Sequence, residues 1–254
     1  MVALYHTEAL VLRARKYMEA DSLLTLLTRE KGKVSAIAKG VRKPNSRLRG
    51  GVQAFTHNDM LLYEGRNLDV VTQSQCLEAF VLLHEDMSAM AAASYWSELL
   101  DAMIEEGEKD QELFNLALSG FHALCLLPRK LTVRGLEIKL LSRLGYTPCL
   151  EKCVSCGCPA GGASHVLFAP QLGGILCREC SQAKPAVKQC CFSNEALAVW
   201  QQLLRMDLSK IGRLKLSAQG LGVLGQAVDE FLALLLERPL KSAPVLKEMM
   251  READ

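Results

Sequence analysis

Residues 140–157 read LLSRLGYTPCLEKCVSCG, and residues 173–180 read GGILCREC. Their cysteines form two C-x2-C pairs, Cys153 with Cys156 and Cys177 with Cys180. Two such pairs can bring four thiolates onto one tetrahedral ion, and their separation lies at the edge of the range for zinc sites. We therefore expect one structural Zn²⁺ per chain. Four unligated core cysteines are the alternative, with Cys149 and Cys158 as substitutes if one ligand is misassigned.

The segment between the two cysteine pairs is typical of a short two-stranded ribbon, with His165, Phe168 and a Gly-Gly turn at residues 173–174. The first pair follows a predicted helix that ends at Gly145, so a bound ion would fix that helix to the chain that follows. We place the metal arm at residues 149–181.

The composition is that of a globular chain of 254 residues, half of them hydrophobic, which is long enough for one large or two modest domains. The ten cysteines are spread over a mid-sized chain, and the most regular four have metal-ligand spacing. We infer a reducing cytoplasm rather than a disulfide scaffold. The first residues, interrupted by His6 and Glu8, are not a signal peptide. No apolar run approaches the roughly 18–20 residues that span a bilayer, so we expect no membrane partner.

The net charge of +2 hides two runs of opposite sign. Between residues 29 and 49, eight basic residues face the single acid Glu30. Between residues 85 and 112, nine acidic residues face only Lys109. A local excess of one sign says more about partners than the total does. The acidic run has three interpretations: a solvated helical face, a surface that repels nucleic acid, or a binding site for a basic partner.

Residues 1–79 have the pattern of β structure. Alternating or apolar runs predict five short strands, at residues 8–15, 22–28, 34–39, 53–63 and 68–75. Residues 40–51 form a loop that is rich in basic residues and glycine. Five strands with one long loop predict a small closed barrel of the OB type.

After Leu77 the hydrophobic period changes from about 2 to about 3.6 residues. Helices are predicted at residues 79–106, 110–126, 130–144, 193–206 and 217–237. Ser193 and Ser217 are the expected N-caps of the last two. The predicted fold class is α+β, with an OB-fold nucleic-acid-binding domain at residues 1–79 and a helical domain at residues 80–254 that carries the metal arm.

The sequence argues against an enzyme. It contains no P-loop, no G-x-S-x-G elbow and no H-E-x-x-H motif. His6–Thr7–Glu8 matches the H-x-E half of a zinc deaminase signature, but the required P-C-x-x-C is missing, since Cys153 follows Pro148–Cys149 one residue too late. Four cysteines would also close the coordination position that a catalytic zinc ion keeps open.

The positive signal is electrostatic. A basic loop beside a small barrel provides a positive surface for the phosphates of nucleic acid, and binding is favourable because each neutralised phosphate releases condensed counterions. An OB groove also lets single-stranded bases stack on aromatic side chains. The candidate DNA-binding cations are Arg13, Arg15, Lys39, Arg42, Lys43, Arg47 and Arg49. The aromatic candidates are Tyr5, Tyr17, Phe55 and Tyr63. The alternatives are a solvated surface for the cations and a core position for the rings.

The helix predicted at residues 130–144 carries an apolar stripe with basic residues on both sides. Packing of the stripe in a core is one interpretation. The other is an apolar groove for a peptide with acidic and hydrophobic residues, rimmed by Arg134, Lys139 and Arg143.

Four segments in this order resemble the bacterial recombination mediator and DNA repair protein family RecO. They are ALVLRARKYMEADSLLTLLTREKGKV (9–34), AKGVRKPNSRLRGGVQAF (38–55), LEIKLLSRLGYTPCLEKCVSCG (136–157) and RPLKSAPVL (238–246). Each is loose alone, but their order and spacing are specific, and the resemblance runs nearly end to end.

The resemblance implies an OB fold, a helical domain and a structural zinc arm in a cytoplasmic, nucleoid-associated bacterial protein. It implies ATP-independent binding of single- and double-stranded DNA, annealing of complementary strands, and help in loading RecA onto DNA coated by single-strand-binding protein, with RecR as partner. By position it assigns DNA binding to the seven cations, the acidic tail of single-strand-binding protein to Arg134, and the metal to the four cysteines.

We therefore hypothesise a non-enzymatic recombination mediator. The rival hypothesis is a zinc-ribbon adaptor between proteins with incidental DNA affinity, which would keep its function when the basic loop is neutralised. The sequence leaves open the oligomeric state, the RecR contact surface, the strand preference and the roles of Cys149, Cys158, Cys190 and Cys191.

Overall fold

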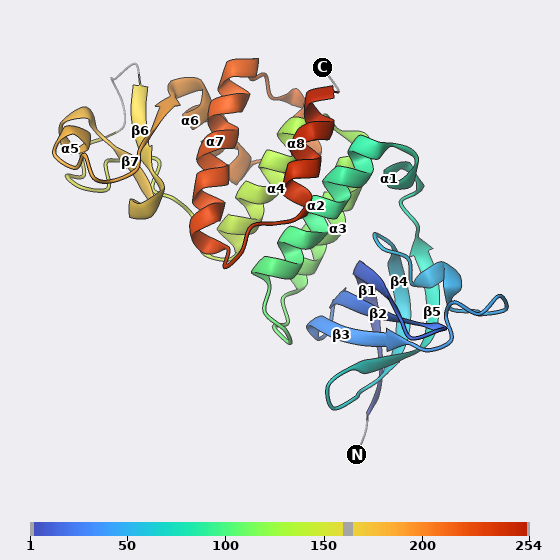
Figure 1. Cartoon of the computed structure of the whole chain (residues 1–254). Helices are drawn as coiled ribbons and strands as arrows, with labels where there is room; N and C mark the ends of the chain where they lie inside the picture. Colours follow the sequence, from blue (N-terminus) through green and yellow to red (C-terminus); the bar gives the residue numbers. More distant parts are fainter. Residues whose placement is uncertain (1–2, 160–164, 253–254) are drawn as a thin grey trace. The chain divides into compact units, whose positions relative to one another are not determined.

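The computed structural model describes residues 3–159 and 165–252, without the side chains of Arg49, His165 and Glu252. It has the α+β architecture that the sequence predicts, with five strands followed by helices and a small second sheet (Figure 1). The segment at residues 160–164, which belongs to the predicted metal arm, lies outside the described residues.

Contacts divide the chain into two compact units. The first contains Met1–Leu126 and Leu240–Asp254, and the second contains Leu127–Pro239. Strands give way to helices between Glu78 and Val81. The predicted division into domains at residues 79 and 80 follows that change of secondary structure and stays a prediction.

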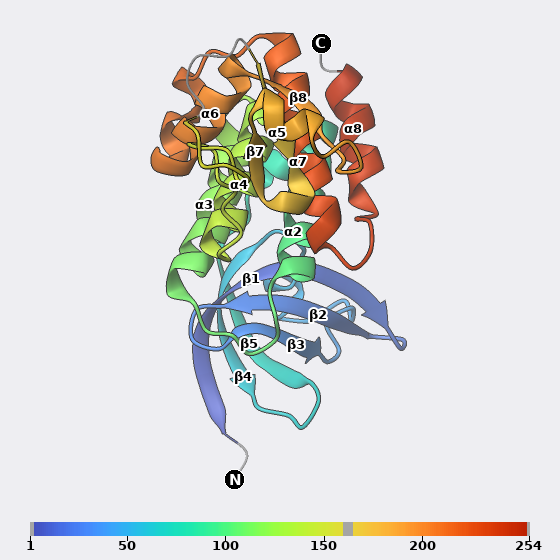
Figure 2. The same ribbon diagram turned by 90° about the vertical axis from the view of Figure 1, so that its left-hand side faces the viewer.

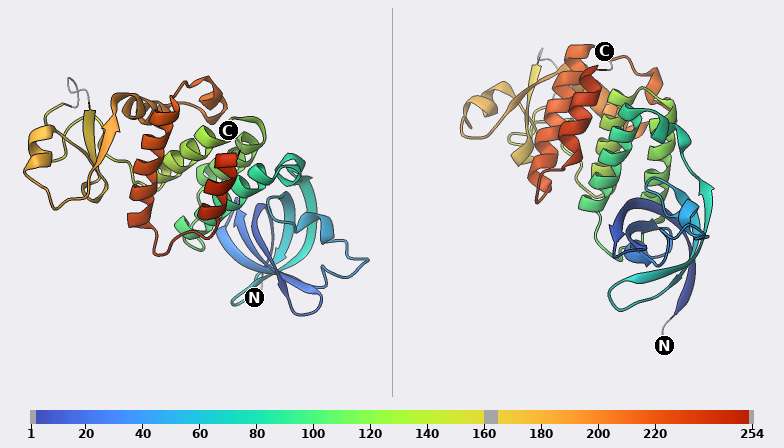
Figure 3. Two further views of the ribbon diagram at one scale, coloured as in Figure 1. Left: turned by 45° about the horizontal axis from the view of Figure 1, so that its top comes forward. Right: turned by 45° about the vertical axis from the view of Figure 1, so that its right-hand side comes forward.

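The first unit contains a closed five-stranded barrel. Its strands are β1 (Leu4–Tyr17), β2 (Asp21–Thr28), β3 (Gly32–Ala38), β4 (His57–Tyr63) and β5 (Asp69–Glu78). Their order is β1-β2-β3-β5-β4, and the barrel closes because β1 pairs with both β2 and β4. The β3–β5 pair is parallel and the others are antiparallel. The predicted OB-type barrel is confirmed; Figures 2 and 3 show its strands from three further directions.

A β-bulge in β1 reverses which residues face the barrel core. Ala9 and Val11 point inward and are fully buried. The register then shifts between Val11 and Arg13, and beyond the shift Ala14 pairs with the inward-facing Leu24. Residues directly opposite each other on neighbouring strands point to the same face, so Ala14 lies on the inner face and the adjacent Arg13 on the outer face of the strand.

The loop between β3 and β4, residues 39–56, projects from the barrel and contains the short 3-10 helix η1, Arg49–Gly51 (Figures 1 and 3). It is anchored at both ends. The backbone N–H of Gly40 donates to the Asp21 carboxylate at 2.7 Å, and the Ser74 hydroxyl donates to the Gly51 carbonyl at 3.1 Å. A Cβ at Gly51 would lie 2.3 Å from the Ser74 oxygen, so the anchor requires glycine.

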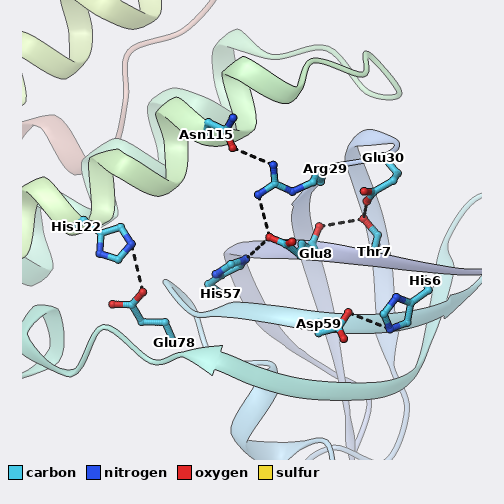
Figure 4. Close-up of polar contacts among 10 residues, drawn as sticks. All are labelled: His6, Thr7, Glu8, Arg29, Glu30, His57, Asp59, Glu78, Asn115 and His122. Carbon is cyan, nitrogen blue, oxygen red and sulfur yellow. Dashed lines mark hydrogen bonds and ion pairs between the residues drawn. The ribbon is translucent and has the colours of Figure 1, made fainter. Parts of the chain in front are cut away.

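Polar contacts fasten the barrel to α3 within the first unit (Figure 4). The Glu8 carboxylate accepts a hydrogen bond from Arg29 at 3.0 Å and lies 3.1 Å from the His57 ring nitrogen. Arg29 also donates to the Asn115 side chain at 3.0 Å, and its guanidinium lies 4.5 Å from the centre of the Phe114 ring. Glu8 and Arg29 therefore have a structural role at this contact.

The helices of the first unit are α1 (Val81–Glu85), α2 (Met87–Met103), α3 (Gln111–Leu126) and α8 (Ser242–Glu252). The single helix predicted at residues 79–106 is wrong, because Asp86 adopts an extended backbone and caps α2 by accepting from the N–H groups of Ser88 and Ala89. Helix α8 was not predicted. Its start is fixed by the Glu98 carboxylate, which accepts the N–H groups of Lys241 and Ser242.

Much of the acidic run has local partners rather than forming one solvated face. Asp86, Asp110 and Glu98 cap helices. Asp101 lies 3.4 Å from the Lys33 ammonium, and Glu106 accepts from the Ser35 hydroxyl at 2.7 Å. These carboxylates stabilise the contact between the barrel and its helices.

The second unit has three long helices, α4 (Arg129–Arg143), α6 (Asn194–Arg205) and α7 (Ala218–Leu235), with the 3-10 helix η3 (Leu208–Arg213). The predicted N-caps are confirmed: the hydroxyl of Ser193 accepts from the N–H of Ala196, and that of Ser217 from the N–H of Gly220. An aromatic cluster forms the centre of the core: the Phe168 ring contacts those of Phe192, Trp200 and Phe231, and Phe192 also contacts Trp200.

A small sheet completes the second unit. It consists of β6 (His165–Ala169), β7 (Gly174–Leu176) and β8 (Cys190–Ser193) in the order β7-β6-β8, with the 3-10 helix η2 (Pro170–Leu172) and α5 (Arg178–Gln182) beside it. The expected two-stranded ribbon is present as β6 and β7, and β8 adds a third strand. Phe168 on β6 pairs with Cys190 on β8, which leads directly into α6.

Candidate metal site and nucleic-acid surface

Four cysteine sulfur atoms in the second unit lie close together. All lie within 4.8 Å of one another, and they belong to Cys153, Cys156, Cys177 and Cys180. The first two lie in the turns after α4, and the last two lie at the start of α5. Four soft donors that converge in this way fit a tetrahedral ion such as Zn²⁺. The structure thus brings together the two pairs that the sequence singles out.

Backbone N–H groups favour the thiolate form at two of these sulfurs. Burial alone would raise the pKa of Cys153, but the N–H groups of Cys177, Cys156 and Ser155 hydrogen-bond its sulfur and lower the pKa to about 6. The N–H of Cys180, 3.5 Å from the sulfur of Cys177, lowers the pKa of that thiol. Because metals bind the thiolate, the backbone prepares these sulfurs for a metal ion.

The two cysteine pairs are joined through the backbone. The N–H of Cys153 donates to the carbonyl of Cys158 at 2.8 Å, and that of Gly157 donates to the carbonyl of Cys153 at 2.9 Å, which closes the first turn. The N–H of Val154 then donates to Ile175 of β7 at 2.9 Å. Strand β7 leads into the second pair, so backbone hydrogen bonds hold the two pairs in register.

The other cysteines of this region lie apart from the four sulfurs, with one exception. The thiol of Cys149 faces the carbonyl of Lys152 at 3.5 Å. Cys190 is buried and its thiol faces the carbonyl of Phe168 at 3.7 Å, whereas Cys191 is exposed. Cys190 and Cys191 lie in β8. The exception is Cys158, which packs, like Cys177 and Cys180, against the hydrophobic cluster of Cys153, Ala169 and Leu176.

Basic side chains gather at the end of the barrel where β1 finishes and the loop of residues 39–56 begins. Lys16 pairs with Ser22, which pairs with Ala38, so Lys16 and Lys39 lie across three neighbouring strands. The N–H of Arg42 donates to the carbonyl of Ala20 at 2.8 Å and holds the loop against the β1–β2 turn. We call this surface the basic end; its exposed cations are Arg15, Lys16, Lys39, Arg42, Lys43 and Arg47.

Within the described part of the chain, no cation of the basic end forms an ion pair or a side-chain hydrogen bond. The neighbouring cations of the same basic run do. Arg29, Lys31 and Lys33 pair with Glu8, Glu64 and Asp101 at 3.0, 2.9 and 3.4 Å. Carboxylates therefore neutralise the basic run at one place and leave its charge unpaired at the basic end.

Two predicted DNA-binding residues differ from the others. Arg13 is half-buried and lies near Glu98. Burial acts to raise the pKa of Glu98, whereas hydrogen bonds from Ser242 and Lys241 and the charge of Arg13 lower it. The charge of Arg13 is thus partly offset within the protein. The side chain of Arg49 lies outside the described residues.

One exposed cation of the basic end, Lys16, is not among the predicted residues. Alternation along β1 places it on the opposite face from Arg15. Lys16 is nevertheless exposed, because it lies beside the final residue of the strand. The run of basic residues at positions 13, 15 and 16 is the sequence feature that could have identified it.

The four candidate aromatic residues fall into two classes. The Tyr5 hydroxyl donates to Asp69, and Phe55 is buried in contact with the Phe121 ring, so both have structural roles. Tyr17 and Tyr63 are 37% and 43% exposed. Tyr17 ends β1 beside the basic end, where its ring is available to a base.

The predicted peptide site lies on α4, whose apolar stripe is packed in the core: Val133, Leu136 and Leu140 are at most 4% exposed. The stripe is therefore not an open groove. Arg134 donates to Glu137 at 2.9 Å and to Asp229 at 2.6 Å. On the same helix, Lys139 is half-buried, which lowers its pKa, and Arg143 is exposed.

Family models match almost the whole chain. The model described as "Recombination protein O N terminal" matches residues 1–80, and the one described as "Recombination protein O C terminal" matches residues 84–244. None of the helices in the described ranges has both the length and the apolar character needed to cross a membrane.

Several curated proteins, each named "DNA repair protein RecO", are similar over nearly their full length. The protein from Heliobacterium modesticaldum is 40% identical over 98% of this chain and 91% of its own. Those from Moorella thermoacetica and Desulforamulus reducens are 37% and 34% identical, again over 98% of this chain, and over 92% and 96% of theirs. With its OB-type barrel, its converging cysteines and these similarities, the chain belongs to the RecO family of DNA repair proteins.

Proposed function

We propose that this protein is a non-enzymatic recombination mediator. It binds single- and double-stranded DNA, anneals complementary strands and assists loading of RecA onto DNA coated by single-strand-binding protein. The observation that carries the proposal is the unpaired charge of the basic end. Six exposed cations without a carboxylate partner among the described residues are available to phosphates.

The mechanism is electrostatic. Each phosphate neutralised at the basic end releases counterions, which drives binding without sequence readout. Two strands held on one positive surface repel each other less, so complementary bases meet and pair without nucleotide hydrolysis. Tyr17 supplies a stacking surface beside the phosphates.

The metal in this proposal is one structural Zn²⁺ per chain. Cys153, Cys156, Cys177 and Cys180 would hold it and fill its four positions. When bound, the ion would crosslink the turn after α4 to the start of α5, and we propose no part for it in DNA binding. Four cysteine ligands would leave no open coordination position for a substrate, so the proposal gives the metal no catalytic role.

The proposed partners are RecR and the acidic C-terminal tail of single-strand-binding protein, with RecA acting indirectly, in the bacterial cytoplasm close to the nucleoid. The tail would bind at Arg134, Lys139 and Arg143. Arg134 already donates to Glu137 and Asp229, so the exposed Arg143 is the position chosen for the test. Arg143→Glu should then weaken binding of a labelled tail peptide, whereas Arg205→Glu, a control far along the sequence on α6, should not. Unchanged affinity would remove this part of the proposal.

Annealing of two dye-labelled complementary oligonucleotides tests the function directly. The full chain should accelerate pairing without ATP, and the acceleration should fall steeply as salt rises, because counterion release weakens. An annealing rate that is independent of salt, or one that requires ATP, contradicts the mechanism. The same assay on strands coated with single-strand-binding protein then tests the mediator step.

A further inference from the structure

Five cysteines lie at the candidate metal site, whereas a tetrahedral ion needs four. Besides the four converging sulfurs, the half-buried Cys158 packs against the hydrophobic cluster that contains Cys153, as Cys177 and Cys180 do. Its carbonyl accepts the backbone N–H of Cys153 at 2.8 Å. The fifth cysteine is therefore held against the first of the candidate ligands, and the function proposed above gives it no role.

A glycine with open space around it lies between Cys156 and Cys158. Gly157 separates them and has φ of +77°, a conformation that other residues rarely adopt, with no heavy atom within 4 Å of where its Cβ would be. Cys153 and Cys158 have the spacing C-x4-C, which is also within the range for zinc ligands. The bond from the N–H of Cys153 to the carbonyl of Cys158 holds the second cysteine against the first.

The ligands also differ in how well they are protected. Cys153 is 3% exposed, whereas Cys156 is exposed to solvent. Cys156 is thus the ligand most accessible to solvent, and Cys158 is its neighbour. Cys149, in contrast, faces the carbonyl of Lys152 and is not in place to substitute.

We propose that Cys158 is a reserve metal ligand that replaces Cys156. If Cys156 were released and took up a proton, the Cys158 thiol would give up its proton and supply the fourth thiolate, so the arm would stay folded. This inference rests on the metal site of the proposed function and adds a fifth ligand residue to it.

The test uses the full chain, reduced and metal-free, titrated with Co²⁺ and then Zn²⁺. Charge-transfer absorption of Co²⁺ increases with the number of bound thiolates, so the spectrum reports how many cysteines bind. The variants are Cys156→Ala, Cys158→Ala, both together, and Cys153→Ala. The matched control is Cys149→Ala combined with Cys156→Ala. Alanine is chosen because serine would offer an oxygen ligand.

Cys156→Ala should keep the four-thiolate spectrum and an uptake of one ion per chain, and so should Cys158→Ala and the matched control. The double Cys156/Cys158 variant should lose the four-thiolate spectrum, as Cys153→Ala does. The proposal is overturned if Cys156→Ala alone behaves like Cys153→Ala, or if the double variant still shows four thiolates.

Metal uptake by the unaltered chain separates this inference from the rest. If the unaltered chain takes up neither ion, the metal site and its reserve ligand are both wrong. DNA binding at the barrel, measured on the same samples, is expected to be equal in all variants, so failure of the reserve ligand leaves the proposed function standing.

Discussion

Neutralising three cations of the basic end should weaken DNA binding by an amount that the structure sets. Arg42, Lys43 and Arg47 are exposed and have no partner among the described residues, so replacing each with Gln removes positive charge without breaking a contact. Surface changes of this kind alter stability little, within about 0.5 kcal/mol. The variant should therefore fold and melt like the unaltered chain.

The expected loss follows from counterion release. Each phosphate contact on a single strand contributes about 0.7 to the slope of log K against log salt, so three contacts contribute about 2. Relative to about 1 M salt, one such contact strengthens binding about fivefold at about 0.1 M, and three strengthen it about a hundredfold. The triple variant should lose about that factor in affinity.

Fluorescence anisotropy of a labelled oligothymidine, titrated with protein at several KCl concentrations, gives both quantities. The matched control replaces Arg205, Lys210 and Arg238 of the second unit with Gln, which changes the net charge by the same amount. The control should keep its salt slope and lose little affinity.

Two results would refute the reasoning. If the triple variant bound with an unchanged slope, phosphates would not be held at the basic end. If both variants lost equal affinity, net charge and not its placement would govern binding.

Further outcomes are expected from other sites. The Cβ of Gly51→Ala would lie 2.3 Å from the Ser74 oxygen, so this variant should destabilise the protein by about 1–3 kcal/mol and weaken DNA binding. Gly50 has open space around it, so Gly50→Ala should change neither the melting temperature nor the DNA affinity. Glu8→Gln should cost about 1 kcal/mol at neutral pH, a low value because the carboxylate is partly exposed. Burial acts to raise the pKa of Glu8, but Arg29 and His57 lower it below 4.5. The Glu8 carboxylate therefore stabilises the fold above that pH, and this stabilisation is lost as the pH falls. The difference in the free energy of unfolding between the two proteins, measured with urea, should shrink in acid, and a constant difference would contradict this. Chelation, or acid strong enough to protonate the four cysteine sulfurs, should release the metal and expose the second unit to protease while the barrel stays resistant.

The elements of the fold could be predicted from the sequence because their signals are local. Alternating or apolar runs located all five strands, and Ser193 and Ser217 were recognisable as caps because capping involves the next three residues. The break at Asp86 and helix α8 escaped prediction for different reasons. Asp86 interrupts a continuous apolar period, and α8 begins where Glu98, far away in the sequence, accepts its first N–H groups.

The candidate sites divide in the same way. Spacing alone predicted that Cys153, Cys156, Cys177 and Cys180 converge, because each pair is local and one ion requires both. Charge alone did not separate Arg29 from Arg42, although both lie in the same basic run. Pairing of Arg29 with Glu8 depends on which strands meet in the barrel, and the bulge in β1 changes which side chains face outward.

The first compact unit is built from both ends of the polypeptide, and this has a consequence for its synthesis. A ribosome adds about 5–20 residues per second, so residues 127–239 must emerge before the C-terminal helix can reach α2. Until then the Glu98 carboxylate lacks the hydrogen bonds that Lys241 and Ser242 will donate, and the face of α2 that contacts α8 is open to water. Nascent chains therefore carry an unfinished first unit for several seconds, and shortened translation products never complete it.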